Sequence, residues 1–391
     1  MLKSMLKDSQ TKIFRKALRV LRIIDKNTYS KLVDTKFELA LTGGHGLRDL
    51  TFVYLVLKQN INISESLLSH LDIFLKIVLD KLQEFCQDID QILSGVPSLT
   101  EDEIAKYILY LKISAVSIHH YFEQKISYGQ KLISMIDLLY KIPVSFLTEK
   151  FLYTYCSAIL YFAESKQNRR LFLTPSIELI FIKILLNLSP DYRLKICSKI
   201  AELLNSFKIG TIYAAVLPLA VNVNDEASDS EKNIKISNFY LNFVKIRNQI
   251  LQNSIIDNNQ LQSLQAENII IYLAFFLSGQ CNREYSFLAS SENLEPSEIF
   301  SSAIRSALCP IANGANYHKL FNIISTLENC RLKNIPSNIE KSDNDLFKIA
   351  NICKIMQSEL NLLVKKNEIV LENSLKQGVE IPKKYFEWNI G

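Results

Sequence analysis

Apolar residues recur at steps of three and four through most of the chain, and this helical period restricts the choice of fold more than any other feature. It is clearest from Ser64 to Leu93. The apolar positions there are Leu67, Leu68, Leu71, Phe74, Leu75, Val78, Leu79, Leu82, Phe85, Ile89 and Ile92. Charged residues lie between them, so the segment is predicted to form one long amphipathic helix. No stretch keeps a period of two, and we expect little or no sheet.

Glycine and proline usage agrees with a helical fold. The 391 residues include 10 glycines and 9 prolines, whereas average usage would give about 27 and 20. A sandwich, a barrel or a Rossmann sheet needs more tight turns, and therefore more of both residues. Most of those present fall between the apolar segments, where they would begin or end helices. Pro218 instead falls inside a predicted helix over 211–222 and should kink or split it.

A helix-start pattern recurs along the first half of the chain. A hydrophobic residue precedes a Ser or Thr N-cap, and acids follow in the first turn, as in Leu99-Thr100-Glu101-Asp102-Glu103. Four such starts, at residues 63, 99, 147 and 188, are spaced by 36, 48 and 41 residues, close to the period of two-helix repeats. The predicted fold class is therefore all-α, an irregular α-solenoid of antiparallel helix pairs with a long C-terminal helix. An irregular helical bundle is the alternative.

Polar stretches divide the helical pattern. The segment 223–233 (VNDEASDSEKN) is rich in Asp, Glu and Ser, and 331–344 is a weaker break. The expected parts are a basic amphipathic helix (1–24), a helical repeat array (25–222), a polar acidic loop (223–233), a second helical block (234–330) and a C-terminal helix with its tail (331–391). The C-terminal helix is predicted over 343–375.

The first 24 residues are strongly basic. They carry seven Lys and Arg against one Asp, a local charge of +6, so the remaining residues sum to −1 of the total +5. The basic side of the predicted helix is formed by Lys12, Arg15, Lys16, Arg19 and Arg22. Such a helix suits a mitochondrial presequence, an anionic membrane surface, a phosphate backbone, or a solvated first helix. No apolar run is long enough for an integral membrane segment.

The segment 188–209 (LSPDYRLKICSKIAELLNSFKI) resembles the helix-pair repeats of the FAST-kinase-like and heptatricopeptide families. The residues that carry the resemblance are Leu188, Ser189, Asp191, Leu203, Leu204, Asn205, Ser206, Phe207 and Ile209. Weaker echoes occur at 99–113 and 147–162, and a RAP-type C-terminal pattern is absent. The resemblance implies a non-enzymatic helical repeat protein of mitochondria that contacts RNA or ribosomal particles.

Two groups of basic residues in the body are candidates for contact with nucleic acid. One lies in the predicted connection 165–170 and the other on the helix predicted over 191–206, which opens the next repeat: Lys166, Arg169, Arg170, Arg193, Lys195 and Lys199. Tyr192 and Phe172 are available nearby for stacking on bases. The charge of −1 beyond residue 24 argues for weak attraction to phosphate, so an ordinary solvated face stays open.

A glycine cluster precedes the helix predicted over 47–59. Gly43, Gly44 and Gly46, with Arg48 as counter-charge, suit an anion-binding nest at a helix start. The spacing is not that of a P-loop, and a flexible connection between helices is the alternative.

The sequence offers no pattern for catalysis, metal binding or a cofactor. Its seven cysteines are never closer than 21 residues, so no zinc-type pair exists and a reducing compartment is expected. His119 and His120 are adjacent on a predicted helix and point about 100° apart, which is unsuitable for one metal. No local nucleophile–base motif occurs. We expect no enzyme activity, no metal and no cofactor.

These features together predict a scaffold that docks other proteins in a larger complex, with RNA as a second ligand. The expected setting is the mitochondrial matrix, in a ribonucleoprotein such as the mitoribosome, as a component or an assembly factor. The alternative is a cytosolic or secreted bacterial scaffold of the effector type, which would give a cytoplasmic location.

Overall fold

The computed structural model describes the following residues: 20, 23, 26–42, 46–58, 63–87, 100–122, 125–140, 149–164, 169, 173–221, 230–253, 265–281, 296–312, 316–333, 348–366 and 381–388. The chain divides into two compact units, Met1–Phe162 and Ala163–Gly391, and each is considered by itself. The fold of the described residues is all-α with one small sheet, which confirms the predicted class. The solenoid arrangement stays a prediction.

Unit 1 is built from helices alone among its described residues. They are α3 (Lys26–Thr42), α4 (Leu47–Lys58), α5 (Glu65–Gln87), α7 (Glu101–His120), α8 (Ile126–Tyr140) and α9 (Glu149–Glu164), of which the last two residues fall in unit 2. Helix α4 packs on α7, and α5 packs on α3, α7 and α8. The apolar stripe of α5 is buried from Leu67 to Phe85, as its period predicts.

The predicted start of α7 is confirmed in detail. Thr100 is the N-cap: its hydroxyl accepts a hydrogen bond from the Glu103 amide (3.3 Å), and the Glu103 carboxylate accepts one from the Thr100 amide (2.8 Å). This reciprocal capping box satisfies two amides that no helical carbonyl reaches.

Asp72 on α5 ties that helix to the start of α8. Its carboxylate accepts hydrogen bonds from Lys125 and from the Tyr128 hydroxyl (2.7 Å) and pairs with Lys76 (3.2 Å). Burial raises the pKa of Asp72, but the three hydrogen bonds outweigh burial and lower the pKa to about 2. The carboxylate therefore stabilises the fold fully above about pH 4, and this contribution is lost as the pH falls through about 2.

We expect Asp72→Asn to destabilise unit 1 by about 1–2 kcal/mol at neutral pH, because the shifted carboxylate is replaced by a neutral group. The difference from the wild type should vanish near pH 2. Urea unfolding at several pH values measures it. Asp80→Asn is the matched control, since Asp80 pairs with Lys131 but is 62% exposed, against 19% for Asp72. An equal loss in both variants would contradict the assignment.

Unit 2 contains most of the remaining elements. They are α11 (Pro175–Asn187), α12 (Pro190–Asn205), the 3-10 helix η2 (Thr211–Ala215), α13 (Val216–Val221), α14 (Ser230–Asn253), η4 (Ala266–Asn268), α16 (Ile269–Ser278), η5 (Gly279–Cys281), α17 (Pro296–Leu308), α18 (Tyr317–Leu327), β1 (Cys330–Leu332), α19 (Ile349–Lys366) and β2 (Phe386–Trp388).

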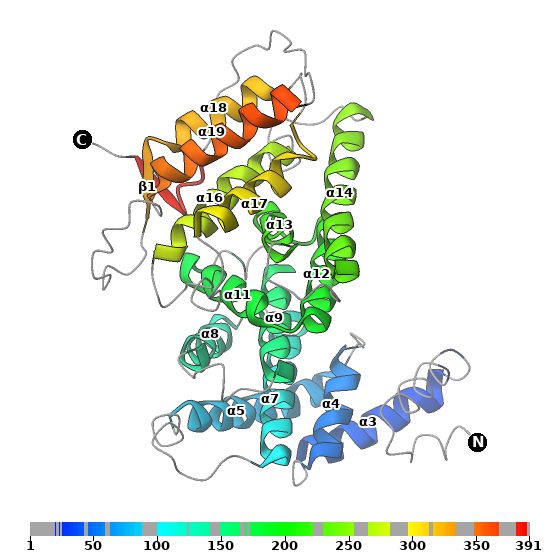
Figure 1. The fold of residues 1–391 in the computed structure, drawn as a ribbon. Coiled ribbons are helices and arrows are strands. Elements are labelled where there is room, and N and C mark those ends of the chain that lie inside the picture. Colours follow the sequence, from blue (N-terminus) through cyan, green and yellow to red (C-terminus); the bar gives the residue numbers. More distant parts are fainter. Residues whose placement is uncertain are drawn as a thin grey trace. The chain divides into compact units, whose positions relative to one another are not determined.

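Helix α16 forms the centre of unit 2. Every residue of the helix is buried except Tyr272, which is half-buried. The helix packs on η2, α17, α18 and α19 (Figure 1). A helix that is apolar on all sides needs such neighbours around its whole circumference.

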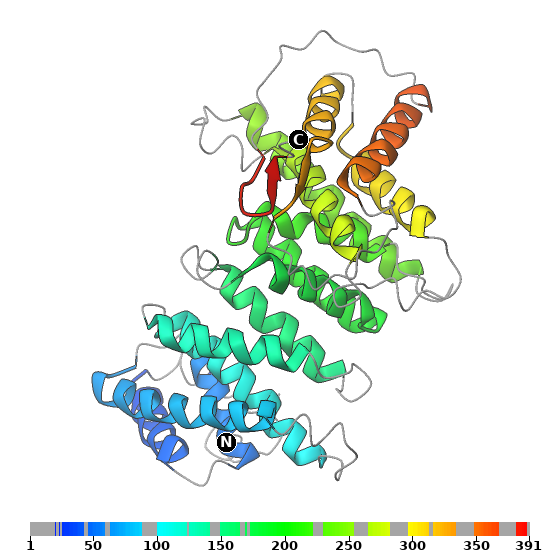
Figure 2. The same ribbon diagram turned by 90° about the vertical axis from the view of Figure 1, so that its left-hand side faces the viewer.

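The C-terminal part of the chain adds a strand pair that the helical period did not predict. Strands β1 and β2 are antiparallel, with Arg331 opposite Glu387 (Figure 2). The predicted C-terminal helix over 343–375 corresponds to α19, and 367–380 lie outside the described residues. Three-residue strands are too short to show a period, so pairing with a distant partner decides their conformation.

The polar loop 223–233 does not separate the units. Helix α14 after the loop packs on α12 and α13 before it, so both sides belong to unit 2. The last residues of the predicted loop, from Ser230 onward, already form the first turn of α14. The predicted 211–222 helix is split, as Pro218 implied: η2 ends at Ala215, and Pro218 lies in the first turn of α13, where its missing amide costs no helical hydrogen bond.

Candidate interaction surface

Many of the predicted contact residues lie outside the described part of the chain. These are Lys12, Arg15, Lys16, Arg19, Arg22, Gly43, Gly44, Lys166 and Arg170. Their predicted roles stay predictions.

Arg193 does not lie on a solvent-exposed basic face. It is 1% exposed and shares the inner side of α12 with Ile196, Cys197 and Ile200. The prediction that Arg193 contacts nucleic acid is therefore wrong, because the same helical period that exposes Lys195 turns Arg193 toward the core. The remaining α12 residues keep part of the expected arrangement: Lys195 is exposed, Lys199 is half-buried, and the Lys195 ammonium lies 4.6 Å from the Tyr192 ring centroid.

Gly46 and Arg48 flank the start of α4. The Gly46 carbonyl accepts a hydrogen bond from the Leu50 amide (3.0 Å), and Arg48 is exposed. Asp49 also lies in the first turn. Its negative charge already complements the helix dipole and would repel a bound anion, so these residues give the anion nest no further support.

A buried carboxylate in unit 2 brings together residues that the sequence did not connect. Glu178 on α11 is 2% exposed. Its Oε1 accepts hydrogen bonds from the Lys384 ammonium (3.0 Å) and from the Tyr385 hydroxyl (3.1 Å), both just before β2. The Tyr385 ring packs on Tyr272 and Phe275 of α16, with centroids 5.8 and 4.7 Å apart. The C-terminal segment is thus fastened to α11 and α16.

This Glu178 cluster fits a structural anchor better than a reactive centre. Burial raises the pKa of Glu178 above its ordinary value, while the Lys384 charge, the hydrogen bonds from Lys384 and Tyr385 and the Arg169 charge act in the opposite direction. Burial also raises the pKa of Tyr385 far above its usual range, so its hydroxyl stays protonated and donates. Arg169, a predicted nucleic-acid contact, is half-buried, and its charge acts on this carboxylate.

Helix α14 has a firmly packed inner side and an exposed outer side. Its inner side is fixed at two points: the Tyr240 hydroxyl donates to the Ala307 carbonyl of α17 (2.9 Å), and Arg247 donates to the Leu204 carbonyl at the end of α12 (3.3 Å). The Arg247 guanidinium also lies 4.0 Å from the centroid of Phe207, which has a positive φ of 58°. Burial lowers the pKa of Arg247 to about 10. These contacts hold the outer side of α14 in a set orientation.

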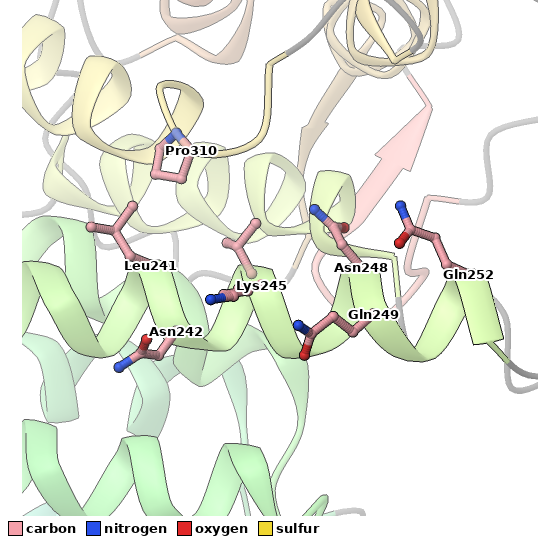
Figure 3. Close-up of a pocket in the computed structure, with 8 residues that line it drawn as sticks. Leu241, Asn242, Lys245, Asn248, Gln249, Gln252 and Pro310 are labelled. Atoms are coloured by element: carbon pink, nitrogen blue, oxygen red, sulfur yellow. The ribbon is translucent and has the colours of Figure 1, made fainter.

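A groove of about 450 Å³ lies between the outer side of α14 and the turn after α17. We call it the α14 groove. Its lining residues are Leu241, Asn242, Val244, Lys245, Asn248, Gln249, Gln252 and Pro310. Figure 3 shows Asn248 and Gln252 projecting from α14 on the side of Pro310, Asn242 and Gln249 projecting on the other side, and Lys245 between them. Four of the eight lining residues therefore carry side-chain amides, and the others are three apolar residues and Lys245.

A second, smaller hollow of about 360 Å³ lies beside α17. It is lined by Ser297, Glu298, Ser301, Ser302, Arg305 and Glu359. Arg305 binds Glu359 through two hydrogen bonds of 2.8 and 2.9 Å. Because Arg305 and Glu359 neutralise each other in this bidentate pair, neither charge is left to bind a ligand in the hollow. The α14 groove is therefore the better candidate for ligand binding.

The described residues contain no group of three or more His, Cys, Asp or Glu able to hold a metal ion. Among the helices that the structure describes, none combines the length and apolarity that crossing a bilayer requires. His119 and His120 pack edge to face with each other and lie near Tyr161 of α9. No family model and no curated protein matches the chain.

The α14 groove and the Glu178 cluster were both missed from the sequence. The groove amides are unevenly spaced along α14, at 242, 248, 249 and 252, so their spacing alone does not indicate a site. No local pattern could indicate that Glu178 meets Lys384, since 206 residues separate them.

Proposed function

We propose that this chain is a non-enzymatic helical scaffold that docks other proteins through exposed helix faces, within a mitochondrial ribonucleoprotein such as the mitoribosome or one of its assembly intermediates. It uses no metal and no cofactor. RNA is a second ligand on this proposal, contacted through basic residues such as Lys195 and Lys199.

One observation carries the docking part of the proposal. The outer side of α14 bears amides that have no hydrogen-bond partner within the described part of the chain, beside an exposed Leu241, whereas its inner side is firmly packed. The all-α fold also provides other long helices, whose outer faces could contact a partner in the same way. A mixed polar and apolar surface suits recognition of another macromolecule.

The mitochondrial setting has separate support. The segment 188–209 resembles the repeats of organellar RNA-binding families, and the basic amphipathic pattern of residues 1–24 suits import. The alternative, a cytosolic or secreted bacterial scaffold of the effector type, shares the docking mechanism and differs in location.

The experiment is purification of the tagged chain from its own cells at native expression level, followed by identification of its neighbours and of its mature N-terminus. We expect a discrete complex with ribosomal or other ribonucleoprotein components, and removal of residues up to about 25, as for a cleaved presequence. A chain with an intact start in a cytosolic fraction would favour the alternative. A chain that sediments alone would contradict the scaffold function.

A further inference from the structure

We infer that the α14 groove binds a short, extended, acidic peptide segment of a partner protein. The inference rests on the proposed scaffold function and names the kind of ligand. The juxtaposition that carries it is a set of amides on both sides of Lys245, none of them with a hydrogen-bond partner and the lysine without a carboxylate partner in the described ranges, beside an apolar wall.

The amides of the groove make no hydrogen bonds among the described residues. This distinguishes Asn242, Asn248, Gln249 and Gln252 from several amides elsewhere in the fold. Asn187, Gln280 and Asn329 each donate to a carbonyl four residues earlier, and Asn361 accepts from Tyr317. The four groove amides are thus free to bond with a ligand.

Their presence on α14 is not explained by helix stability. Asparagine is a poor helix former, because its side chain competes with the backbone for hydrogen bonds. An exposed helix face more often carries Lys and Glu, which pair at i,i+4. Helix α14 has one such pair, Glu231 with Lys235, near its start and outside the groove. The two asparagines, Asn242 and Asn248, therefore cost helix stability and make no hydrogen bond among the described residues in return.

The chemistry of a side-chain amide matches that of a peptide backbone. Each Asn or Gln offers one acceptor and two donors. An extended peptide presents its own N–H and C=O groups along its edges, with alternate side chains on one face. The lining residues 241–252 cover about 16 Å of helix at 1.5 Å per residue. That length corresponds to about five residues of extended chain.

Charge favours an acidic peptide over nucleic acid. Lys245 is exposed, has no carboxylate partner among the described residues, and no acid lines the groove. One cation suits one carboxylate. A single-stranded nucleic acid of the same length would bring several phosphates and would require a row of basic residues with stacking aromatics. Leu241, 44% exposed, and Pro310 provide the apolar wall for one neighbouring side chain.

The test measures the binding of fluorescein-labelled nonapeptide mixtures, with Glu, Gln or Lys fixed at the central position, by fluorescence anisotropy. We expect the Glu mixture to bind most tightly to the full chain. Asn248→Ala/Gln252→Ala should weaken binding about tenfold, since two hydrogen bonds are lost. Lys245→Gln should weaken the Glu mixture about fivefold and abolish its advantage over the Gln mixture.

Asn238→Ala is the matched control. Asn238 is exposed on the same helix but does not line the groove. This change should leave binding unaltered. All the alanine variants should keep or raise the melting temperature, because alanine is the better helix former. If a variant loses binding and also has a lowered melting temperature, the measurement is repeated with Asn248→Asp/Gln252→Glu. These substitutions keep the side-chain size and should repel the Glu mixture.

Absence of binding by every mixture at about 1 mM would overturn the inference, since weaker contacts fall below the affinity of docked segments. Equal binding by the variants would also overturn it. Tighter binding by a labelled oligouridylate, lost in the same variants, would assign the groove to RNA instead. Purification of the native complex distinguishes failure of the peptide site from failure of the scaffold function. If the complex persists in the groove variants, the scaffold function stands and the peptide site is wrong.

Discussion

Lys384→Met is expected to lower the free energy of unfolding of unit 2 by about 2 kcal/mol at neutral pH, because it removes the counter-charge of a buried carboxylate, although solvent screens part of this charge at the 37% exposed Lys384 side chain. Among the described residues, Glu178 would keep the hydrogen bond from Tyr385 and the more distant charge of Arg169. The measurement is urea unfolding followed by circular dichroism. Hydrogen exchange over 381–388 should show the loss first, since the Lys333 amide bonds to the Tyr385 carbonyl beside this contact (2.9 Å).

The loss should depend on pH with a definite sign. The pKa of Glu178 is already raised by burial, so its protonation favours the folded state, and this favourable effect is lost as the pH rises through the folded pKa. Removing the lysine raises that pKa further. The penalty of Lys384→Met should therefore be largest at neutral pH and should shrink as the pH falls through the raised pKa of Glu178, because a protonated Glu178 needs no counter-charge.

Two further variants keep this prediction specific. Lys383→Met changes the exposed neighbour and should have little effect. Glu178→Gln/Lys384→Met should be less destabilised than Lys384→Met alone, because an amide has no charge to compensate. If Lys383→Met and Lys384→Met behaved alike, the anchor role of Glu178 would be excluded.

Phe275→Ala should strongly destabilise unit 2, with a loss of about 4 kcal/mol. The ring is fully buried in α16 and contacts Phe276 and Tyr385, with centroids 5.1 and 4.7 Å away. Its removal leaves a cavity that a helix enclosed on all sides fills poorly. The same substitution also removes the contact between the Phe275 ring and Tyr385, which helps to hold the C-terminal segment on α16.

Phe321→Ala on α18 is the control for this truncation. Phe321 is partly exposed and stacks only on Tyr317 among the described rings (6.3 Å). We expect a loss under about 1 kcal/mol, since little apolar surface is removed from the core. Calorimetry compares the two variants. Similar melting temperatures for both would show that α16 is not the centre of the unit.

The sequence predicted the helices well because most of their burial is local and periodic. The α5 stripe and the α7 capping box follow directly from residue spacing. The strand pair and the Glu178 cluster depend on contacts between distant residues, which no window of the sequence contains. Arg193 illustrates a different failure: it was treated as part of a charged group, although its position relative to Ile196, Cys197 and Ile200 places it on the inner side of α12.

The α14 groove was missed for a third reason. Asn and Gln are ordinary polar residues of exposed helix faces, so their presence in α14 does not by itself indicate a site. Their lack of internal hydrogen bonds becomes visible only when the neighbouring elements are in place.

The fastening of residues 384–385 onto α11 also has a consequence for biosynthesis. The ribosome delivers Glu178 about two hundred residues before its partners. Until Lys384 leaves the exit tunnel, the nascent unit must keep a carboxylate at the edge of an unfinished core. Transcripts interrupted by a stop codon before that point should consequently give products that proteases remove quickly, even when the described helices up to α19 have been translated.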